Sequence, residues 1–160
     1  MEENKIIACL KQKKILLERV YNITKQLEAA SIQPDIDFGD LPQQRQVYID
    51  RLKKCERLLS ACIGDLPPED MEHVKGLLSG SVHSDTPGGP DGEYSRYGTD
   101  IRSMLGGIVA MDNEILRNTK KERDRQHRRM KEARKGKNAA AKRPLSLSQM
   151  TLLSFCLSGC

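Results

Sequence analysis

A chain of 160 residues has room for one domain and little more. Hydrophobic residues make up 38% of it, with no Trp, two Phe and four Tyr, which favours an aliphatic helical bundle over a β-sandwich or an enzyme with a large buried pocket. The net charge of +5 conceals an asymmetry. Residues 117–143 carry 13 Lys or Arg against 3 Asp or Glu, a net of +10; residues 144–160 carry no charge, so residues 1–116 carry −5.

The first predicted element is a helix over residues 4–30, because apolar residues recur there at steps of three and four. Lys13 and Lys14 interrupt this stripe at the second and third turns. Pro34 and Gly39 then end the pattern within "SIQPDIDFGD".

A second helix is predicted to begin near Pro42, where the fixed φ of proline suits a first helical position, and to end at Gly64. Its apolar residues are spaced 7, 4, 3, 4 and 3 apart, which is a heptad-like stripe. They are Leu41, Tyr48, Leu52, Cys55, Leu59 and Cys62. We expect Cys55 and Cys62 to be buried and reduced.

A short third helix is predicted in "DLPPEDMEHVKGLLSG", starting at Pro67 or Pro68 and closed by Gly80. The acidic residues Glu69 and Asp70 suit the positive end of its dipole. The following segment, residues 81–98, is rich in Gly, Pro, Ser and Asp and is predicted to be a flexible loop.

Thr99 is predicted to cap the last helix. Its apolar stripe is Ile101, Leu105, Ile108, Met111 and Ile115. Gly106 and Gly107 each cost roughly 1 kcal/mol relative to alanine, a cost that close approach to a neighbouring helix would offset. The basic segment, residues 117–135, continues this helix by propensity, and the helix is expected to end at Gly136.

These elements predict an all-α fold, an antiparallel helical bundle of three long helices plus one short helix, with an extended C-terminal helix. The bundle and its basic helix occupy residues 1–135, with the loop at 81–98. Residues 136–160 are predicted to be a low-complexity, disordered tail. The N-terminal "MEENKIIACLKQKK" lacks the pattern of a signal peptide, and no apolar run approaches the ~18 residues of a membrane span. We therefore expect a cytoplasmic protein that does not insert into membranes.

No catalytic, cofactor or metal pattern stands out in the sequence. His73, His83 and His127 are isolated, and the five cysteines form no CxxC pair. An odd cysteine count in a cytoplasmic chain favours free thiols. We expect a non-catalytic protein without a cofactor or a structural metal.

The basic segment allows two readings. An Arg- and Lys-rich helix can neutralise the phosphates of a nucleic acid. Against this, the segment holds no aromatic residue to stack on bases, and three acids, Glu122, Asp124 and Glu132, are interspersed among its bases. We therefore expect a solvated or protein-facing helix extension rather than a nucleic-acid binder.

Two stretches of the sequence, together with the order of the elements, resemble flagellar export chaperones of the FlgN and FliT type. In "LPQQRQVYIDRLKKCERLL" the matching residues are Arg45, Val47, Ile49, Asp50 and Leu52. In "IRSMLGGIVAMDNEILRNTKKERDR" they are Ile108, Met111, Asp112, Asn113 and Glu114. The order of a long helix, an acidic break, a second long helix, a short helix and a charged last helix is also similar, over residues 1–135.

The resemblance implies a cytoplasmic chaperone that binds C-terminal segments of hook-associated or filament-cap subunits and delivers them to the flagellar type III export apparatus. Capture of a client helix in a groove would use apolar anchors at helical spacing. The expected partner-binding residues are Leu105, Ile108, Met111, Ile115, Arg123 and Met130. A basic nucleic-acid-associated protein and a coiled-coil scaffold, including a homodimer, are the alternatives.

Overall fold

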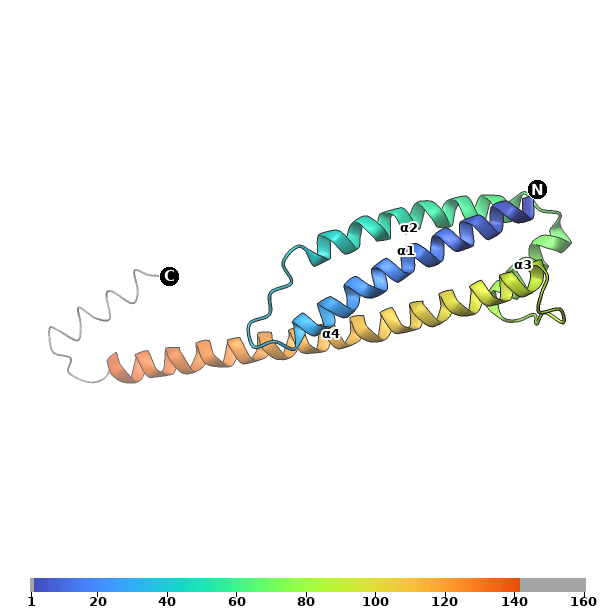
Figure 1. Ribbon diagram of the computed structural model, residues 1–160. Helices are drawn as coiled ribbons and strands as arrows, with labels where there is room; N and C mark the ends of the chain where they lie inside the picture. The colour runs from blue at the N-terminus through green and yellow to red at the C-terminus, as the bar shows by residue number, and fades with distance from the viewer. Residues whose placement is uncertain (1, 142–160) are drawn as a thin grey trace. The chain divides into compact units, whose positions relative to one another are not determined.

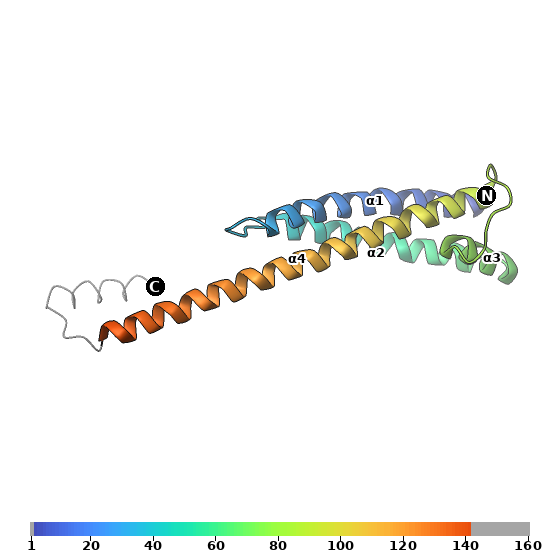
Figure 2. The same cartoon turned by 90° about the horizontal axis from the view of Figure 1, so that it is seen from below.

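A computed structural model describes residues 2–141, and four helices account for 84% of these residues, with no strand among them. The helices are α1 (Glu2–Ser31), α2 (Leu41–Gly64), α3 (Pro68–Ser79) and α4 (Pro90–Ala141). The predicted all-α bundle is confirmed. The chain divides into two compact units, Met1–Asn118 and Thr119–Cys160. Within the first unit, α1, α2 and the adjoining part of α4 lie alongside one another (Figures 1 and 2).

Helices α1 and α4 run parallel with a nearly constant offset in residue number. Lys14 Nζ contacts Asp100 Oδ2 at 2.7 Å, a separation of 86 residues. Asn118 Nδ2 donates to Ser31 Oγ at 3.0 Å, a separation of 87 residues. The two helices therefore keep one register over this length of the bundle.

A third contact in the same register explains one of the two adjacent glycines. A Cβ atom at Gly107 would lie 2.8 Å from Cε2 of Tyr21, whereas nothing lies within 4 Å of a Cβ at Gly106. Gly107 therefore allows the aromatic ring of α1 to approach the backbone of α4. The expectation that close approach offsets the cost of glycine holds for Gly107 alone.

Helix α2 runs antiparallel to both of its long neighbours, as predicted. Lys13 of α1 pairs with Glu56 of α2 at 3.1 Å, and Arg45 near the start of α2 pairs with Asp112 of α4 at 2.7 Å. Lys13 and Lys14, which interrupt the apolar stripe of α1, thus each pair with a carboxylate on a different neighbouring helix. The lysines join helices at the edges of the core.

The core of the first unit is aliphatic, with two tyrosines added. Tyr94 and Tyr97 are buried among its leucines and isoleucines although they fall in the segment predicted as a loop. The core residues are Ile6, Leu10, Leu17, Val20, Leu59, Ile63, Val74, Leu77, Tyr94, Tyr97, Ile101, Ile108 and Met111.

The predicted loop at residues 81–98 is therefore too long by nine residues, because α4 already begins at Pro90. Proline suits the first helical position, and Asp91 and Glu93 favour the positive end of the dipole. Thr99 is not a cap but lies inside the helix, where its hydroxyl donates to the carbonyl oxygen of Ser95 at 2.9 Å. The Gly, Pro and Ser content obscured a helix whose tyrosine face supplies its stability.

Helix α3 ends at Gly80, which has a φ of 79° and occupies the left-handed region as the C-cap, as predicted. The same end of α3 packs closely on α4. A Cβ at Gly98 would lie 2.4 Å from the carbonyl oxygen of Leu78, so only a glycine permits this backbone-to-backbone contact.

Helix α4 does not end at Gly136 as expected but continues through Ala141. A single glycine costs a helix only about 1 kcal/mol, and the three alanines that follow have the highest helix propensity. The predicted disordered tail is therefore wrong for residues 136–141. Residues 142–160, which complete that prediction, lie outside the described residues.

Candidate protein-docking groove

A surface groove of about 410 Å³ lies between α1 and α2. Each helix contributes four residues to its lining, and most of these present carbon or sulfur atoms. The lining residues are Ala8, Cys9, Gln12, Leu16, Arg51, Lys54, Cys55 and Leu58. We refer to this feature as the α1/α2 groove.

Large aliphatic side chains next to this groove remain exposed to solvent. Leu58, which lines it, is 62% exposed. Val47 (49% exposed) lies one turn before Arg51 on α2, and Ile15 (43% exposed) lies three residues after Gln12 on α1, so both share the helix faces that border the groove. Exposed aliphatic groups gathered along a groove are typical of an interaction site.

The only charged residues in the lining of the α1/α2 groove are basic. Arg51 and Lys54 stand one turn apart on α2, with no carboxylate among the lining residues. The Arg51 guanidinium lies 5.6 Å from the ring centroid of Tyr48, a cation–π contact that helps to orient it. The groove therefore combines an apolar floor with a positively charged border on one side.

Two thiols form part of the floor. Cys55 Sγ donates to the carbonyl oxygen of Cys9 at 3.4 Å. Burial raises the pKa of both thiols, and the neighbouring Cys62 and Cys55 raise the pKa of Cys9 further. A raised pKa favours the protonated form of both thiols, which contribute to the floor as small, weakly polar groups.

Cys55 is buried, as predicted, but Cys62 is only half-buried. Within residues 2–141 there is no group of three or more His, Cys, Asp or Glu side chains placed to hold a metal ion. The cysteines are free where the structure describes them, at positions 9, 55 and 62.

A second groove, of about 330 Å³, is lined by residues from all four helices of the first unit and includes Leu105. Arg102 reaches across it, donating to the carbonyl oxygen of Leu78 and to the Thr99 hydroxyl. The border of the second groove is also basic, but Arg102 already donates hydrogen bonds within the bundle. The α1/α2 groove is larger and offers more exposed aliphatic surface.

The structure separates the residues expected to bind a partner. Leu105 borders the second groove. Ile108 and Met111 are buried in the core, and Ile115 is half-buried. The prediction that Ile108 and Met111 offer a partner surface is therefore wrong for this conformation, because the regular stripe of α4 faces its own bundle.

The other two expected residues, Arg123 and Met130, are both exposed and belong to the Thr119–Cys160 unit. The four expected residues of the first unit do not share one exposed surface, because Ile108 and Met111 are buried in its core.

Sequence reasoning missed the exposed residues of the α1/α2 groove. The signal is a second series on α2, Val47, Arg51, Lys54 and Leu58, which recurs at steps of four, three and four beside the buried stripe. A helix with two such series packs one face into the bundle and leaves the other for a further contact.

Comparison with known proteins gave no match to any family model, to any curated protein or to any solved structure. In the part of the chain from residue 2 to 141, no helix has both the length and the apolar character needed to cross a bilayer.

Proposed function

We propose that this protein is a small, non-catalytic binding protein that holds an amphipathic helical segment of another protein in the α1/α2 groove. The observation that carries the proposal is the exposure of Leu58 in a groove whose lining charges are all basic, with the exposed Val47 and Ile15 within one turn of its lining residues. A partner helix would place apolar anchors on this floor and acidic residues beside Arg51 and Lys54.

The client class comes from the resemblance to the FlgN and FliT type of export chaperone. We propose that the clients are C-terminal segments of hook-associated or filament-cap subunits, kept from premature assembly and passed to the flagellar export apparatus in the cytoplasm. A segment that orders only on binding loses part of the interaction energy to that ordering. The resulting moderate affinity suits a chaperone that must release its client.

A direct test measures the binding of fluorescently labelled C-terminal peptides from the hook-associated and cap subunits of the same genome. Leu58→Asp is the test variant and Leu116→Asp its matched control, because both leucines are exposed, at 62% and 67%, and only Leu58 lines the groove. We expect Leu58→Asp to weaken binding of one peptide at least tenfold, as for an interface anchor, and Leu116→Asp to change it less than twofold.

Equal affinities of the two variants would reject the groove as the binding site. Failure of every subunit peptide to bind the unmodified protein would reject the export-chaperone role. Sedimentation of the unmodified protein as a stable dimer that buries Leu58 would favour the coiled-coil scaffold instead.

A further inference from the structure

The part of α4 in the second unit, residues 119–141, has almost no buried face. Every side chain from Arg123 to Ala139 is exposed. The segment holds ten Lys or Arg against three acids. A helix without a buried face gains little from packing, so the distribution of its charges is its main chemical feature.

The charges are not evenly distributed around the helix. At about 100° per residue, half of the basic residues fall within a sector about 120° wide that contains no acid. This basic face consists of Lys120, Arg123, Lys131, Arg134 and Lys137, with His127 and Met130 between them. It extends over about 26 Å, at 1.5 Å per residue.

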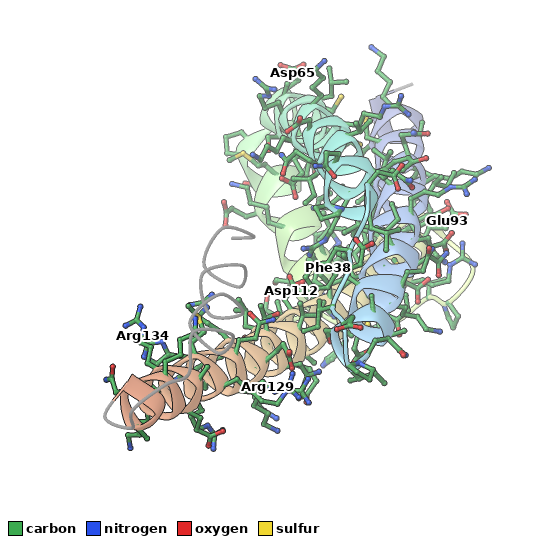
Figure 3. All side chains as sticks on the ribbon, turned by 90° about the vertical axis from the view of Figure 1, so that its left-hand side faces the viewer. Phe38, Asp65, Glu93, Asp112, Arg129 and Arg134 are labelled. Atoms are coloured by element: carbon green, nitrogen blue, oxygen red, sulfur yellow. The ribbon has the colours of Figure 1, made fainter. Side chains whose placement is uncertain are left out.

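The opposite half holds the other five bases together with all three acids. These bases are Lys121, Arg125, Arg128, Arg129 and Lys135. Glu122 is paired there with Arg125 at 3.1 Å. Arg129 and Arg134, which belong to different halves, project from the helix on different sides (Figure 3). The net charge is +5 on the basic face and +2 on the opposite half.

This distribution of charges changes how strongly the acids argue against nucleic-acid binding. In the sequence they are interspersed among the bases, which argues against nucleic acid, but on the helix Glu122 and Glu132 lie away from the basic face and Asp124 lies at its edge, one turn from Lys120. The lack of aromatic residues argues only against single strands, whose bases need stacking partners. A duplex presents phosphates and needs none.

Other polyanionic partners fit this helix less well. An anionic membrane surface requires an apolar face, and Met130 is the only large apolar residue between Thr119 and Ala141. A protein interface needs a desolvated core with apolar or aromatic anchors, which this face also lacks. A helix of about 10–12 Å diameter matches the ~12 Å major groove of B-form DNA, whereas the A-form groove of RNA is too narrow.

We propose that the basic face of α4 binds duplex DNA through its phosphates, without reading the base sequence. Five cationic side chains at helical spacing would neutralise about five phosphates. The DNA contact uses residues outside the α1/α2 groove and does not depend on the proposed client.

The test uses the full-length protein and a fluorescently labelled 20-base-pair duplex of mixed sequence, with anisotropy measured from 50 to 200 mM salt. The logarithm of the binding constant should fall with the logarithm of salt at a slope of about −4 to −5, which corresponds to a loss on the order of 500-fold over this range. A duplex of unrelated sequence should bind within twofold of the first.

Two quintuple variants, which change the net charge equally, distinguish the effect of the basic face on DNA binding from the effect of the total charge. One replaces Lys120, Arg123, Lys131, Arg134 and Lys137 by Gln, and the other replaces Lys121, Arg125, Arg128, Arg129 and Lys135 by Gln. Glutamine keeps the helix propensity, and circular dichroism verifies that the helix persists. We expect the first variant to lose at least ten times more affinity than the second.

Equal losses in the two variants would overturn the proposal, because charge alone would then account for binding. The absence of duplex binding by the unmodified protein at 50 mM salt would also overturn the proposal. A labelled polyglutamate peptide that binds more tightly than the duplex would assign the face to an acidic protein.

Discussion

Arg45 of α2 and Asp112 of α4 form an ion pair of 2.7 Å between Nη2 and Oδ2, across 67 residues of sequence. Both residues belong to the patterns on which the resemblance to export chaperones rests, and the fold brings them together. The pair bridges the two antiparallel helices at one end of the bundle. It therefore favours the rotation of α4 that presents Asp112 to α2.

Replacing Asp112 by Asn should lower the free energy of unfolding by about 1 kcal/mol, because the half-buried Arg45 would lose its charged partner. The side chains are 21% and 36% exposed, so solvent screens part of the interaction. Urea denaturation of Asp112→Asn, Arg45→Gln and the double variant measures the coupling between the residues. Glu114→Gln, which affects a more exposed pair with Arg117, is the control and should cost less than about 0.5 kcal/mol.

The adjacent glycines of α4 should respond in opposite directions to alanine. Gly106→Ala should stabilise the protein by up to about 1 kcal/mol, since nothing lies near the new methyl group and alanine favours the helix. Gly107→Ala should be less stable than Gly106→Ala by about 1–2 kcal/mol, because the methyl group would displace the Tyr21 ring. Thermal unfolding of both variants provides the comparison, and equal melting temperatures would show that Tyr21 does not pack on Gly107.

Alkaline pH should destabilise the first unit through the buried thiol of Cys55 and the half-buried thiol of Cys9. Because burial raises the pKa of Cys9 and Cys55 above the ordinary value of 9.0, the folded state holds these protons more tightly than the unfolded state. The stability that comes from keeping these thiols protonated is fully present below pH 9 and is lost as the pH rises through their raised pKa values in the folded state. Urea unfolding at pH 8 and pH 10 should show a larger loss in the unmodified protein than in Cys9→Ala/Cys55→Ala, and equal losses would contradict this assignment.

Truncation after Asn118 should leave the first unit folded. The core residues all precede Thr119, and Asn118 itself keeps its hydrogen bond to Ser31. We expect the melting temperature to change by less than about 5 °C, a shift that corresponds to roughly 1 kcal/mol for a domain of this size. A loss of cooperative unfolding in the truncated chain would show that residues after 118 stabilise the bundle.

The helix ends that depend on proline and glycine were predictable from the sequence. Pro42 and Gly80 mark the start of α2 and the end of α3 correctly because these residues act through local backbone geometry. Gly64 is the last residue of α2, as predicted, but it does not adopt the left-handed conformation of a glycine cap. The start of α4 was not predictable from the sequence, since this part of the helix is stabilised by the packing of Tyr94 and Tyr97 into a core that also includes α1 and α3. Composition describes the segment as a loop, and tertiary packing makes it a helix.

The candidate groove could be predicted only in part for a similar reason. A single stripe identifies which residues of a helix are apolar, and for Ile108 and Met111 that face is used within the bundle itself. The α1/α2 groove depends on which faces of two helices remain uncovered. That information comes from the pairing of the helices and not from either helix alone.

The near-constant offset of 86 or 87 residues between α1 and α4 has a consequence for the order of folding. The α1/α2 contact between Cys9 and Cys55 closes a segment of 46 residues, whereas each α1/α4 contact must close a segment nearly twice as long, at an added entropic cost of about 0.6 kcal/mol. The α1/α2 hairpin should therefore form first, with α4 docking last and in a single step, since one register satisfies Lys14, Tyr21 and Ser31 together. A kinetic intermediate, if trapped by rapid mixing, would be a two-helix hairpin that already contains the α1/α2 groove.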